Sequence, residues 1–489
     1  MPDITHATIR MYKMGTGDCF TIKFYTGATV SFKMMIDCGT WSGTKDYLTQ
    51  FIKVLKEDMQ DHINLLVVTH EHKDHVAVFK TCEDLLTSNF TVDKVWMSWT
   101  ENDKDKKVKQ WQKDFGQKRK ALAMAADKLQ LALKDPVFQQ QMNMEYRGKD
   151  MLAARQSFAD AISNFNTLHN EDVAGTYVGG LPGMNVVKKT IGKDNIDYYS
   201  PGDIITNLPG LEGITLYVLG PPLTAEEVKK ETGGKGESYD HNKELAESDA
   251  FATAVLATEG TTGLSLLPFE DIYTTTDPNA SSTLAYMEPN ESWRKIDNEW
   301  LFSAGSLALR MNSITNNLSL ALAIEFNASG RVMLFPGDAE YGSWLSWHSI
   351  PWKAPCRNSK AHFTEDLLSR TVFYKVAHHL SHHGTAERLG MEMMTHPDLA
   401  AMATLDYDVI SSGWKNTMPN RALLKALVAQ TKGRLMVMNP KDLFYDTGNT
   451  TLLSDRIQQE RKKMTATDAK DFANAYKDEP LFHEYTVKG

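Results

Sequence analysis

One stretch constrains this chain more than any other, the run Leu-Leu-Val-Val-Thr-His-Glu-His-Lys-Asp-His at positions 65–75. A short apolar run that ends in three histidines and an aspartate is typical of a buried strand that delivers metal ligands from its carboxyl end. Imidazole nitrogens and carboxylate oxygens suit a borderline divalent ion such as zinc. We assign His70 and His72 to one ion, and Asp74 and His75 to an adjacent second ion. A turn that merely collects surface histidines does not account for four ligand-type residues in this register.

Composition describes an ordinary soluble protein. The length of 489 residues exceeds one average domain, although a large α/β core with insertions accommodates it. The formal charge of −9 disfavours a globally basic nucleic-acid binder but still allows a local basic groove. The four cysteines have no Cys-x-x-Cys spacing, so we expect reduced core thiols rather than disulfides or a zinc ribbon. The start has no signal-like pattern and no run approaches a membrane span, so we expect a cytoplasmic protein with no membrane association.

Two later strand-like runs also end in ligand-type side chains. The segment 332–340 places Asp338 after a strand and a glycine. A carboxylate there has two oxygens with which to touch two ions about 3.5 to 4 Å apart; the alternative is a cap of the following helix. The segment 373–385 carries two pairs of histidines. Upstream, Asp37 ends a third run and is expected either to accept a histidine N–H behind the ligands or to cap a turn.

The ligand stretch resembles the His-x-His-x-Asp-His signature of the metallo-β-lactamase fold superfamily. The pieces similar to its ComEC-like branch lie at 15–39, 65–75, 214–222, 312–340 and 373–419. The hydrolase domain of the protein that gives this branch its name is associated with degrading a DNA strand. The resemblance implies an α/β fold, an αββα sandwich with a one- or two-metal hydrolytic site on one edge. It leaves the substrate open, because one fold hosts many chemistries.

Within this resemblance, Asp338 matches the carboxylate that bridges two ions, and Lys375 sets the register so that His378 takes a ligand position. Leu380 stands where glycine is usual, and a second histidine pair follows it. The expected metal ligands are His70, His72, Asp74, His75, Asp338 and His378. The candidate catalytic residues are Asp74, His379 and His382. Asp74 would orient the attacking water, and each histidine would position substrate, protonate a leaving group or serve the structure only.

Two positions depart from the ligand pattern of many relatives. Asn316 stands where a histidine is common, as asparagine does in the ComEC-like branch, so we expect the first ion to be held less fully or with a water. Met418 follows a strand expected to begin at Tyr407 and replaces the histidine that completes the second site. A thioether is a poor zinc ligand, so the second ion is expected to be weak, absent, or completed by a histidine of the segment 378–383.

The motifs also divide the chain. We expect a discontinuous metallo-β-lactamase-like core over 1–99 and 181–445, with a loop or lid over 223–300 inside it. Residues 100–180 predict a helical insertion, because apolar residues recur there at helical spacing. Residues 446–489 are polar and helical in pattern, and predict a surface appendage.

The residues together predict a hydrolase, because metal binding lowers the pKa of water towards about 7 and the same ions neutralise charge on a phosphoryl or carbonyl oxygen. We expect a phosphodiesterase or nuclease acting on nucleic acid or a nucleotide, with zinc in one or two positions and manganese as the alternative ion. Hydrolysis of a small ester, thioester or lactam is the enzymatic alternative. A catalytically weakened metal-binding subunit, docking a partner protein through 100–180, is the other. The basic run 104–120 fits either a nucleic-acid contact or a solvated helix face.

Overall fold

The computed structural model describes residues 2–88, 90–106, 108–109, 181–230, 233–234, 237, 313–357, 362–410, 415 and 418–489. The chain divides into two compact units, and the first comprises Met1–Asp103, Gly179–Glu244 and Ser313–Gly489. The helical insertion expected over 100–180 and the loop or lid expected over 223–300 lie almost wholly outside the described residues.

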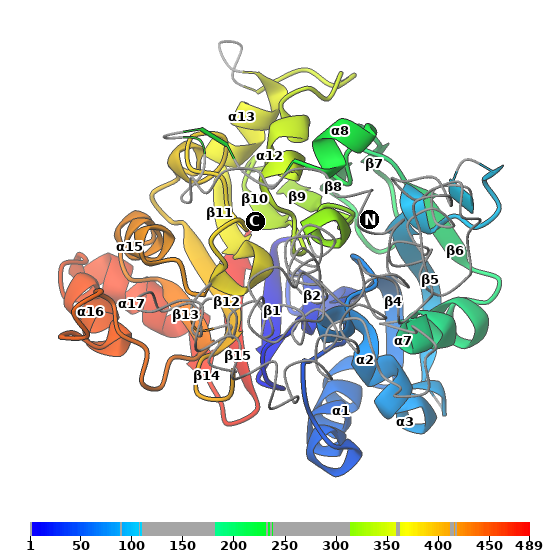
Figure 1. Ribbon diagram of the computed structural model, residues 1–489, viewed down its shortest axis with the longest axis horizontal. Helices are drawn as coiled ribbons and strands as arrows, with labels where there is room; N and C mark the ends of the chain where they lie inside the picture. The colour runs from blue at the N-terminus through cyan, green and yellow to red at the C-terminus, as the bar shows by residue number, and fades with distance from the viewer. Residues whose placement is uncertain are drawn as a thin grey trace, which may run out of the picture. The chain divides into compact units, whose positions relative to one another are not determined.

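Two mixed β-sheets organise the described part of the chain (Figure 1). The first has the order β14-β15-β1-β2-β3-β4-β5-β6. Its strands are β1 (His6–Tyr12), β2 (Phe20–Thr26), β3 (Thr29–Ile36), β4 (His62–Val67), β5 (Thr91–Ser98), β6 (Ile196–Tyr199), β14 (Tyr476–Asp478) and β15 (Phe482–Lys488). The pairs from β3 to β6 are parallel, and the others are antiparallel. Parallel strands are covered on both faces, which explains the unbroken apolar run at the end of β4.

The second sheet has the order β13-β12-β11-β10-β9-β8-β7. Its strands are β7 (Ile204–Ile205), β8 (Ile214–Val218), β9 (Leu322–Phe326), β10 (Val332–Phe335), β11 (Thr371–Lys375), β12 (Ala400–Asp406) and β13 (Leu435–Asn439). From β10 to β13 the strands are parallel, so their carboxyl ends meet at one edge. The strand expected to begin at Tyr407 instead ends at Asp406 as β12.

Helices complete the described fold. They are α1 (Lys45–Met59), α2 (Lys73–Thr81), α3 (Glu83–Thr87), α7 (Leu181–Val186), α8 (Ala225–Val228), α12 (Tyr341–Trp347), α13 (Phe363–Ser369), α15 (Arg421–Gln430), α16 (Leu453–Arg461) and α17 (Ala466–Ala475), with 3₁₀ turns at Trp99–Glu101, Ala377–Leu380 and Met391–Met393 and a π turn at Val187–Ile191. No helix within the described ranges is long and apolar enough to cross a membrane.

Two apolar clusters hold these layers together. One lies between the sheets and joins Leu65 and Trp96 of the first sheet to Ile324 and Met333 of the second. The other joins the opposite face of the first sheet to α1, α2, α3 and α7. The chain is therefore a mixed α/β protein with two sheets, which confirms the expected fold class at that level.

The C-terminal segment differs from the surface appendage expected over 446–489. Its helices α16 and α17 agree with the helical pattern, but β15 pairs with β1 in register from His6↔Lys488 to Tyr12↔Phe482. The appendage prediction is wrong for these last residues. Glu484 masks the strand pattern, because it is a buried acid that pairs with Arg10 at 2.5 Å rather than an exposed one.

His483 of β15 gives a pH test of this pairing. Burial, followed by the charge of Lys13, lowers its pKa to about 4 from 6.5. Between these values the unfolded chain binds a proton that the folded protein does not, so the free energy of unfolding falls as the pH falls from 6.5 towards 4. We expect His483 to account for about 2 kcal/mol of the loss between pH 7 and pH 5. Urea unfolding of His483→Gln should show that much less loss than the wild type; an equal loss would contradict the burial of this ring.

Candidate metal centre

The stretch 65–75 forms a strand, a turn and a helix. β4 ends at Val67 and α2 begins after His72. Asp37 fixes the turn, because Thr69 donates its backbone N–H to Oδ1 at 2.8 Å and its hydroxyl to Oδ2 at 2.6 Å. In this turn His70 Nε2 lies 3.0 Å from His72 Nδ1, and both rings are buried. The structure thus brings together the pair assigned to the first ion.

Asp74 and His75 lie in the first turn of α2 and face side chains that follow strands of the second sheet. His75 Nε2 lies 3.0 Å from Asp338 Oδ2. His379 Nε2 lies 2.9 Å from Asp74 Oδ2 and 3.1 Å from Asp338 Oδ2. All four side chains are buried. The pair assigned to the second ion therefore meets residues that follow β10 and β11.

Asp338 is held with one oxygen turned towards this cluster. Gly337 before it has a φ of 60°, a conformation that glycine adopts without steric cost. Lys375 Nζ lies 3.0 Å from Asp338 Oδ1 and donates to the Gly337 carbonyl at 2.8 Å. Oδ2 therefore faces the two histidines, and Oδ1 faces Lys375.

The histidine that reaches Asp338 is His379, one position after the expected ligand His378. The residues His378, His379 and Leu380 have left-handed φ angles of 45°, 50° and 69°. This turn directs His379 into the cluster, whereas His378 Nδ1 lies 3.1 Å from Glu340 Oε1. A register anchored on Lys375 cannot reveal three left-handed residues in succession. The structure thus places His379, and not the expected ligand His378, beside Asp74 and Asp338.

Leu380 allows this turn to be tested. Its side chain is fully buried, so truncation to alanine or glycine should destabilise the protein by about 2 to 5 kcal/mol. A left-handed conformation costs a residue with a Cβ about 1 to 2 kcal/mol. We expect Leu380→Gly to be about 1 kcal/mol more stable than Leu380→Ala in urea unfolding. This order reverses the usual one, and an alanine variant at least as stable as the glycine variant would contradict the turn.

Among the described residues, one group of ligand-type side chains lies within 4.8 Å and can hold an ion: Asp18, His75, Asp338 and His379. Asp18 lies 3.7 Å from Nδ1 of both His75 and His379, on the side of the rings opposite Asp338. It therefore supports the rings from behind, and Asp74 faces the Nε2 side. His382, a candidate catalytic residue from sequence, is outside this group; its ring lies 3.8 Å from that of His383.

The polar atoms that face one another in the cluster are arranged like ligands of a cation rather than like hydrogen-bond partners. Asp74 Oδ1, His75 Nε2 and Asp338 Oδ2 are buried and form no well-aligned hydrogen bond with any residue that the structure describes. Buried polar atoms are seldom left in this state. Two ligands of a tetrahedral ion, each about 2.0 to 2.2 Å from it, lie roughly 3.3 Å apart. The observed 3.0 and 3.1 Å separations are close to that value.

The electrostatics of the cluster also favour a cation. Burial raises the pKa of Asp338, but His379, His75 and Lys375 together lower it well below its ordinary value. Burial lowers the pKa of His379, but Asp338 and Asp74 raise it to about 9. The carboxylates thus draw positive charge onto the rings, which a divalent ion would supply in place of protons. His72 differs, because burial lowers its pKa to about 4 and leaves its ring neutral.

The positions assigned to the two ions, here called the first and second half-sites, have different numbers of ligand-type side chains. Two carboxylates and two imidazoles, from Asp74, Asp338, His75 and His379, surround the position assigned to the second ion. Asn316 donates its side-chain N–H to Glu340 Oε1 at 2.7 Å and lies 3.3 Å from His378 Nε2. Burial raises the pKa of Glu340, but His378 lowers it to about 2. Within the described residues, the first half-site rests mainly on the two histidines of the ligand turn.

Of the residues that support the cluster, Asp37 was expected from the sequence, whereas Trp41 and Asp18 were not. Trp41 donates its indole N–H to Asp74 Oδ2 at 2.7 Å, and no spacing rule points to it. Asp37, expected either as an acceptor or as a turn cap, lies 2.7 Å from His75 Nδ1 and so supports a metal-facing Nε2. Asp18 lies within the segment 15–39 that carries part of the resemblance, but no spacing in that segment singles it out.

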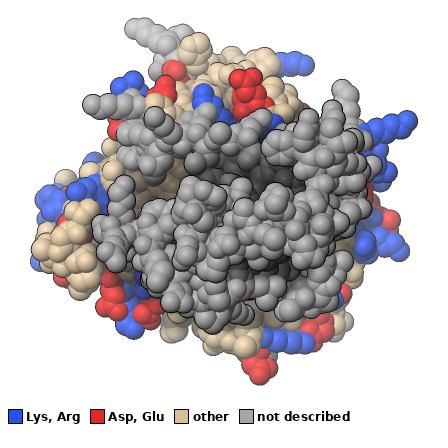
Figure 2. Space-filling view, viewed as in Figure 1, with Lys and Arg blue, Asp and Glu red and all other residues tan. Residues whose placement is uncertain are grey.

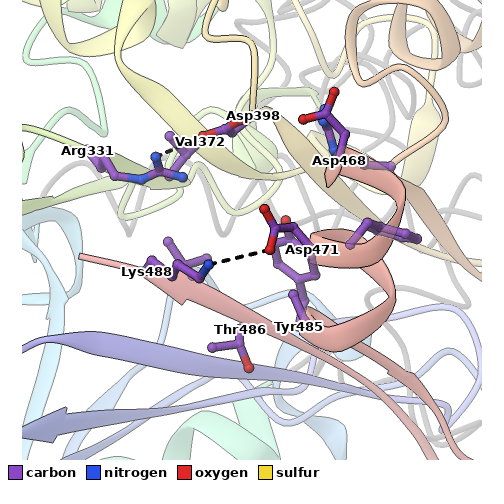
Figure 3. Close-up of a pocket in the computed structure, with 12 residues that line it drawn as sticks. Arg331, Val372, Asp398, Asp468, Asp471, Tyr485, Thr486 and Lys488 are labelled. Atoms are coloured by element: carbon purple, nitrogen blue, oxygen red, sulfur yellow. Dashed lines mark hydrogen bonds and ion pairs between the residues drawn. The ribbon is translucent and has the colours of Figure 1, made fainter. Parts of the chain in front are cut away.

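A separate pocket of about 120 Å³ lies at the opposite ends of β10 to β13 (Figure 3). Two ion pairs line it: Arg331 lies 2.9 Å from Asp398, and Lys488 lies 3.8 Å from Asp471. The charges in each of these pairs neutralise each other. The pocket lies at the opposite ends of the strands from the ligand turn.

Comparisons with protein-family models, with curated proteins and with solved structures find no match to this chain.

Proposed function

We propose that this chain is a metal-dependent hydrolase with the αββα sandwich of the metallo-β-lactamase superfamily, and that it cleaves phosphodiester bonds in a nucleic acid or nucleotide. The observation that supports it best is the convergence of Asp74, His75, Asp338 and His379 beside the His70–His72 pair. These residues come from opposite sheets, and their facing atoms lie about as far apart as ligands of one ion do.

A divalent ion in this site would lower the pKa of a water and neutralise charge on a phosphoryl oxygen. The chain supplies the remaining parts. Asp74 holds Oδ2 towards Trp41 and His379, which leaves Oδ1 able to accept a hydrogen bond from a water and so orient it. Two imidazoles and two carboxylates suit Zn²⁺, and Mn²⁺ is the second choice.

Two features support this substrate class: the carboxylates and histidines that could hold one or two divalent ions, and the resemblance to the ComEC-like branch. The single negative charge of a phosphodiester is shared by two oxygens, and a site that stabilises it needs positive charge at the reacting centre rather than across the surface. On the face in Figure 2, described Lys and Arg side chains lie interspersed with Asp and Glu. The proposal therefore rests on the site and not on a basic face.

A second candidate is a metal-binding subunit with weakened catalysis that docks a partner protein. The observation in its favour is the contact of Asn316 with Glu340, which leaves the first half-site short of ligands. The basic run and most of the segment 100–180, where such a partner was expected, lie outside the described residues.

Purified protein with Zn²⁺ or Mn²⁺ tests the proposal against bis-p-nitrophenyl phosphate, with p-nitrophenyl acetate as the ester alternative. We expect diester cleavage that the double variant His72→Ala, Asp74→Ala abolishes. A matched control is His62→Ala, Asp93→Ala, because this pair lies 2.9 Å apart on the exposed surface. The control should keep wild-type turnover.

Metal content separates the two candidate functions. Elemental analysis that finds one or two ions per chain, together with diester cleavage, supports the hydrolase. An ion without cleavage of either substrate supports the partner subunit. Activity that is equal in the His72, Asp74 double variant and the wild type would refute the site.

A further inference from the structure

The two ring nitrogens of His379 face different surroundings. Nε2 points to Asp74 and Asp338, whereas Nδ1 lies 2.7 Å from Thr404 Oγ1 in β12. A neutral imidazole carries one N–H, so this ring can bind a cation through Nε2 only when the proton is on Nδ1. The group that holds the proton there decides whether His379 can be a ligand.

Thr404 determines the direction of this hydrogen bond. Its hydroxyl donates to Asp18 Oδ1 at 2.7 Å. An ionised carboxylate only accepts, so the single hydroxyl proton of Thr404 is committed to Asp18. Oγ1 can then only accept from His379, which places the ring proton on Nδ1. The second oxygen of Asp18 lies 2.5 Å from Lys375 Nζ, so an ion pair holds this carboxylate in place beside Thr404.

Burial makes this arrangement specific. Asp18, Thr404, His379 and Lys375 are each at most 2% exposed, so bulk water has little access to replace one of the partners. Each link joins a different element: the loop between β1 and β2, the strand β12, and the turn after β11. The acid therefore acts on the ring through a hydroxyl, with no direct hydrogen bond between them.

We propose that Asp18 and Thr404 are positioning residues that hold His379 as its Nδ1–H tautomer and so present Nε2 as a ligand. The role of Nε2 as a metal ligand rests on the proposed metal-dependent function. The direction of the two hydrogen bonds is independent of that function.

The same arrangement occurs beside the first pair of histidines. Thr69 donates its hydroxyl to Asp37 Oδ2 at 2.6 Å, and its Oγ1 lies 3.1 Å from His70 Nδ1. Here the ring nitrogen has a second hydroxyl neighbour, because Ser319 Oγ lies 3.2 Å from His70 Nδ1 and accepts the Asp338 backbone N–H at 3.1 Å. Thr69 therefore does not fix the tautomer of His70 by itself, and the proposal is confined to His379.

We call the two hydrogen bonds that join Asp18, Thr404 and His379 the relay. Substitutions at Thr404 test it through the affinity of the protein for Zn²⁺. Thr404→Val keeps the shape but removes the hydroxyl, and we expect about 10- to 100-fold weaker Zn²⁺ binding in competition with a chromophoric chelator. Thr404→Ser restores the hydroxyl and should recover most of that loss. The matched control is Thr431→Val, also fully buried, whose hydroxyl donates to the Leu427 carbonyl at 2.7 Å at the C-terminal end of α15. It should leave Zn²⁺ affinity unchanged. Equal affinity of Thr404→Val and wild type, or no recovery in Thr404→Ser, would overturn the relay.

Nitrogen chemical shifts test the tautomer without any metal. Metal-free protein labelled with ¹⁵N-histidine is measured at about pH 10, above the His379 pKa of about 9. The His379 signals are assigned by their loss in His379→Gln. We expect the Nδ1–H form in wild type and Thr404→Ser, and a population of the Nε2–H form in Thr404→Val, where Asp74 and Asp338 can accept. A wild-type ring protonated on Nε2 would overturn the proposal.

The two measurements keep the proposals apart. A wild type that has the Nδ1–H ring but binds no Zn²⁺ or Mn²⁺ supports the relay and refutes the metal-dependent hydrolase. A wild type that binds Zn²⁺ while Thr404→Val has unchanged affinity and an unchanged tautomer refutes the relay and leaves the hydrolase standing.

Discussion

Replacing His379 with alanine is expected to prevent metal binding at the second half-site, which has the larger number of ligand-type side chains, and to abolish diester hydrolysis. His379 Nε2 contacts both Asp74 and Asp338, so its loss removes one of two imidazoles and leaves two buried carboxylates less compensated. Removing an outer partner of a ligand typically costs 10- to 100-fold in metal affinity. The loss of the ligand itself should exceed about 100-fold. Isothermal titration with Zn²⁺ and initial rates on bis-p-nitrophenyl phosphate would measure both effects.

His378→Ala is the matched control for this prediction. The two histidines are adjacent in sequence, but His378 contacts Glu340 and Asn316 rather than the acids of the cluster. We expect Zn²⁺ affinity to stay within about threefold of the wild type, well short of the loss of even an outer partner. If His378→Ala loses the ion and His379→Ala keeps it, the left-handed turn described here is wrong and the register read from sequence is right.

Replacing Gly39 with alanine is expected to cost about 3 kcal/mol of stability and to weaken metal binding at least about tenfold. A Cβ at this position would lie 2.2 Å from both the carbonyl carbon of Asp74 and the nitrogen of His75. Backbone atoms cannot rotate away as a flexible side chain can, so the start of α2 must shift. The shift moves two ligands together, and ligand geometry tolerates only about half an ångström.

Gly27→Ala separates this steric effect from a general cost of losing glycine. Gly27 has a φ of 60° in the β2–β3 turn, and nothing lies within 4 Å of a Cβ built there. Its variant should lose about 1 kcal/mol through backbone strain alone. Thermal unfolding and chelator competition on both variants give the comparison. A Gly39→Ala protein with wild-type Zn²⁺ affinity would show that the loop carrying Gly39 does not position the ligand turn.

The strands that carry the ligands could be predicted because their signals are local. In β4 and β10 a few apolar residues precede the ligand, and the ligand types themselves are unusual in such places. By contrast, β12 was placed too late along the chain. Its sequence Ala-Ala-Met-Ala-Thr-Leu-Asp favours a helix by intrinsic propensity, and it is a strand because β11 and β13 flank it and burial covers both faces.

The chain by itself determined the ligand turn, the acid after β10 and the general α/β class, since each depends on residues within about ten positions of one another. Only the tertiary structure decided which histidine joins Asp338, that Thr404 and Asp18 lie behind that ring, and that β15 pairs with β1. These features depend on backbone direction and on contacts between residues hundreds of positions apart. Packing of the two sheets, and not local pattern, selects among them.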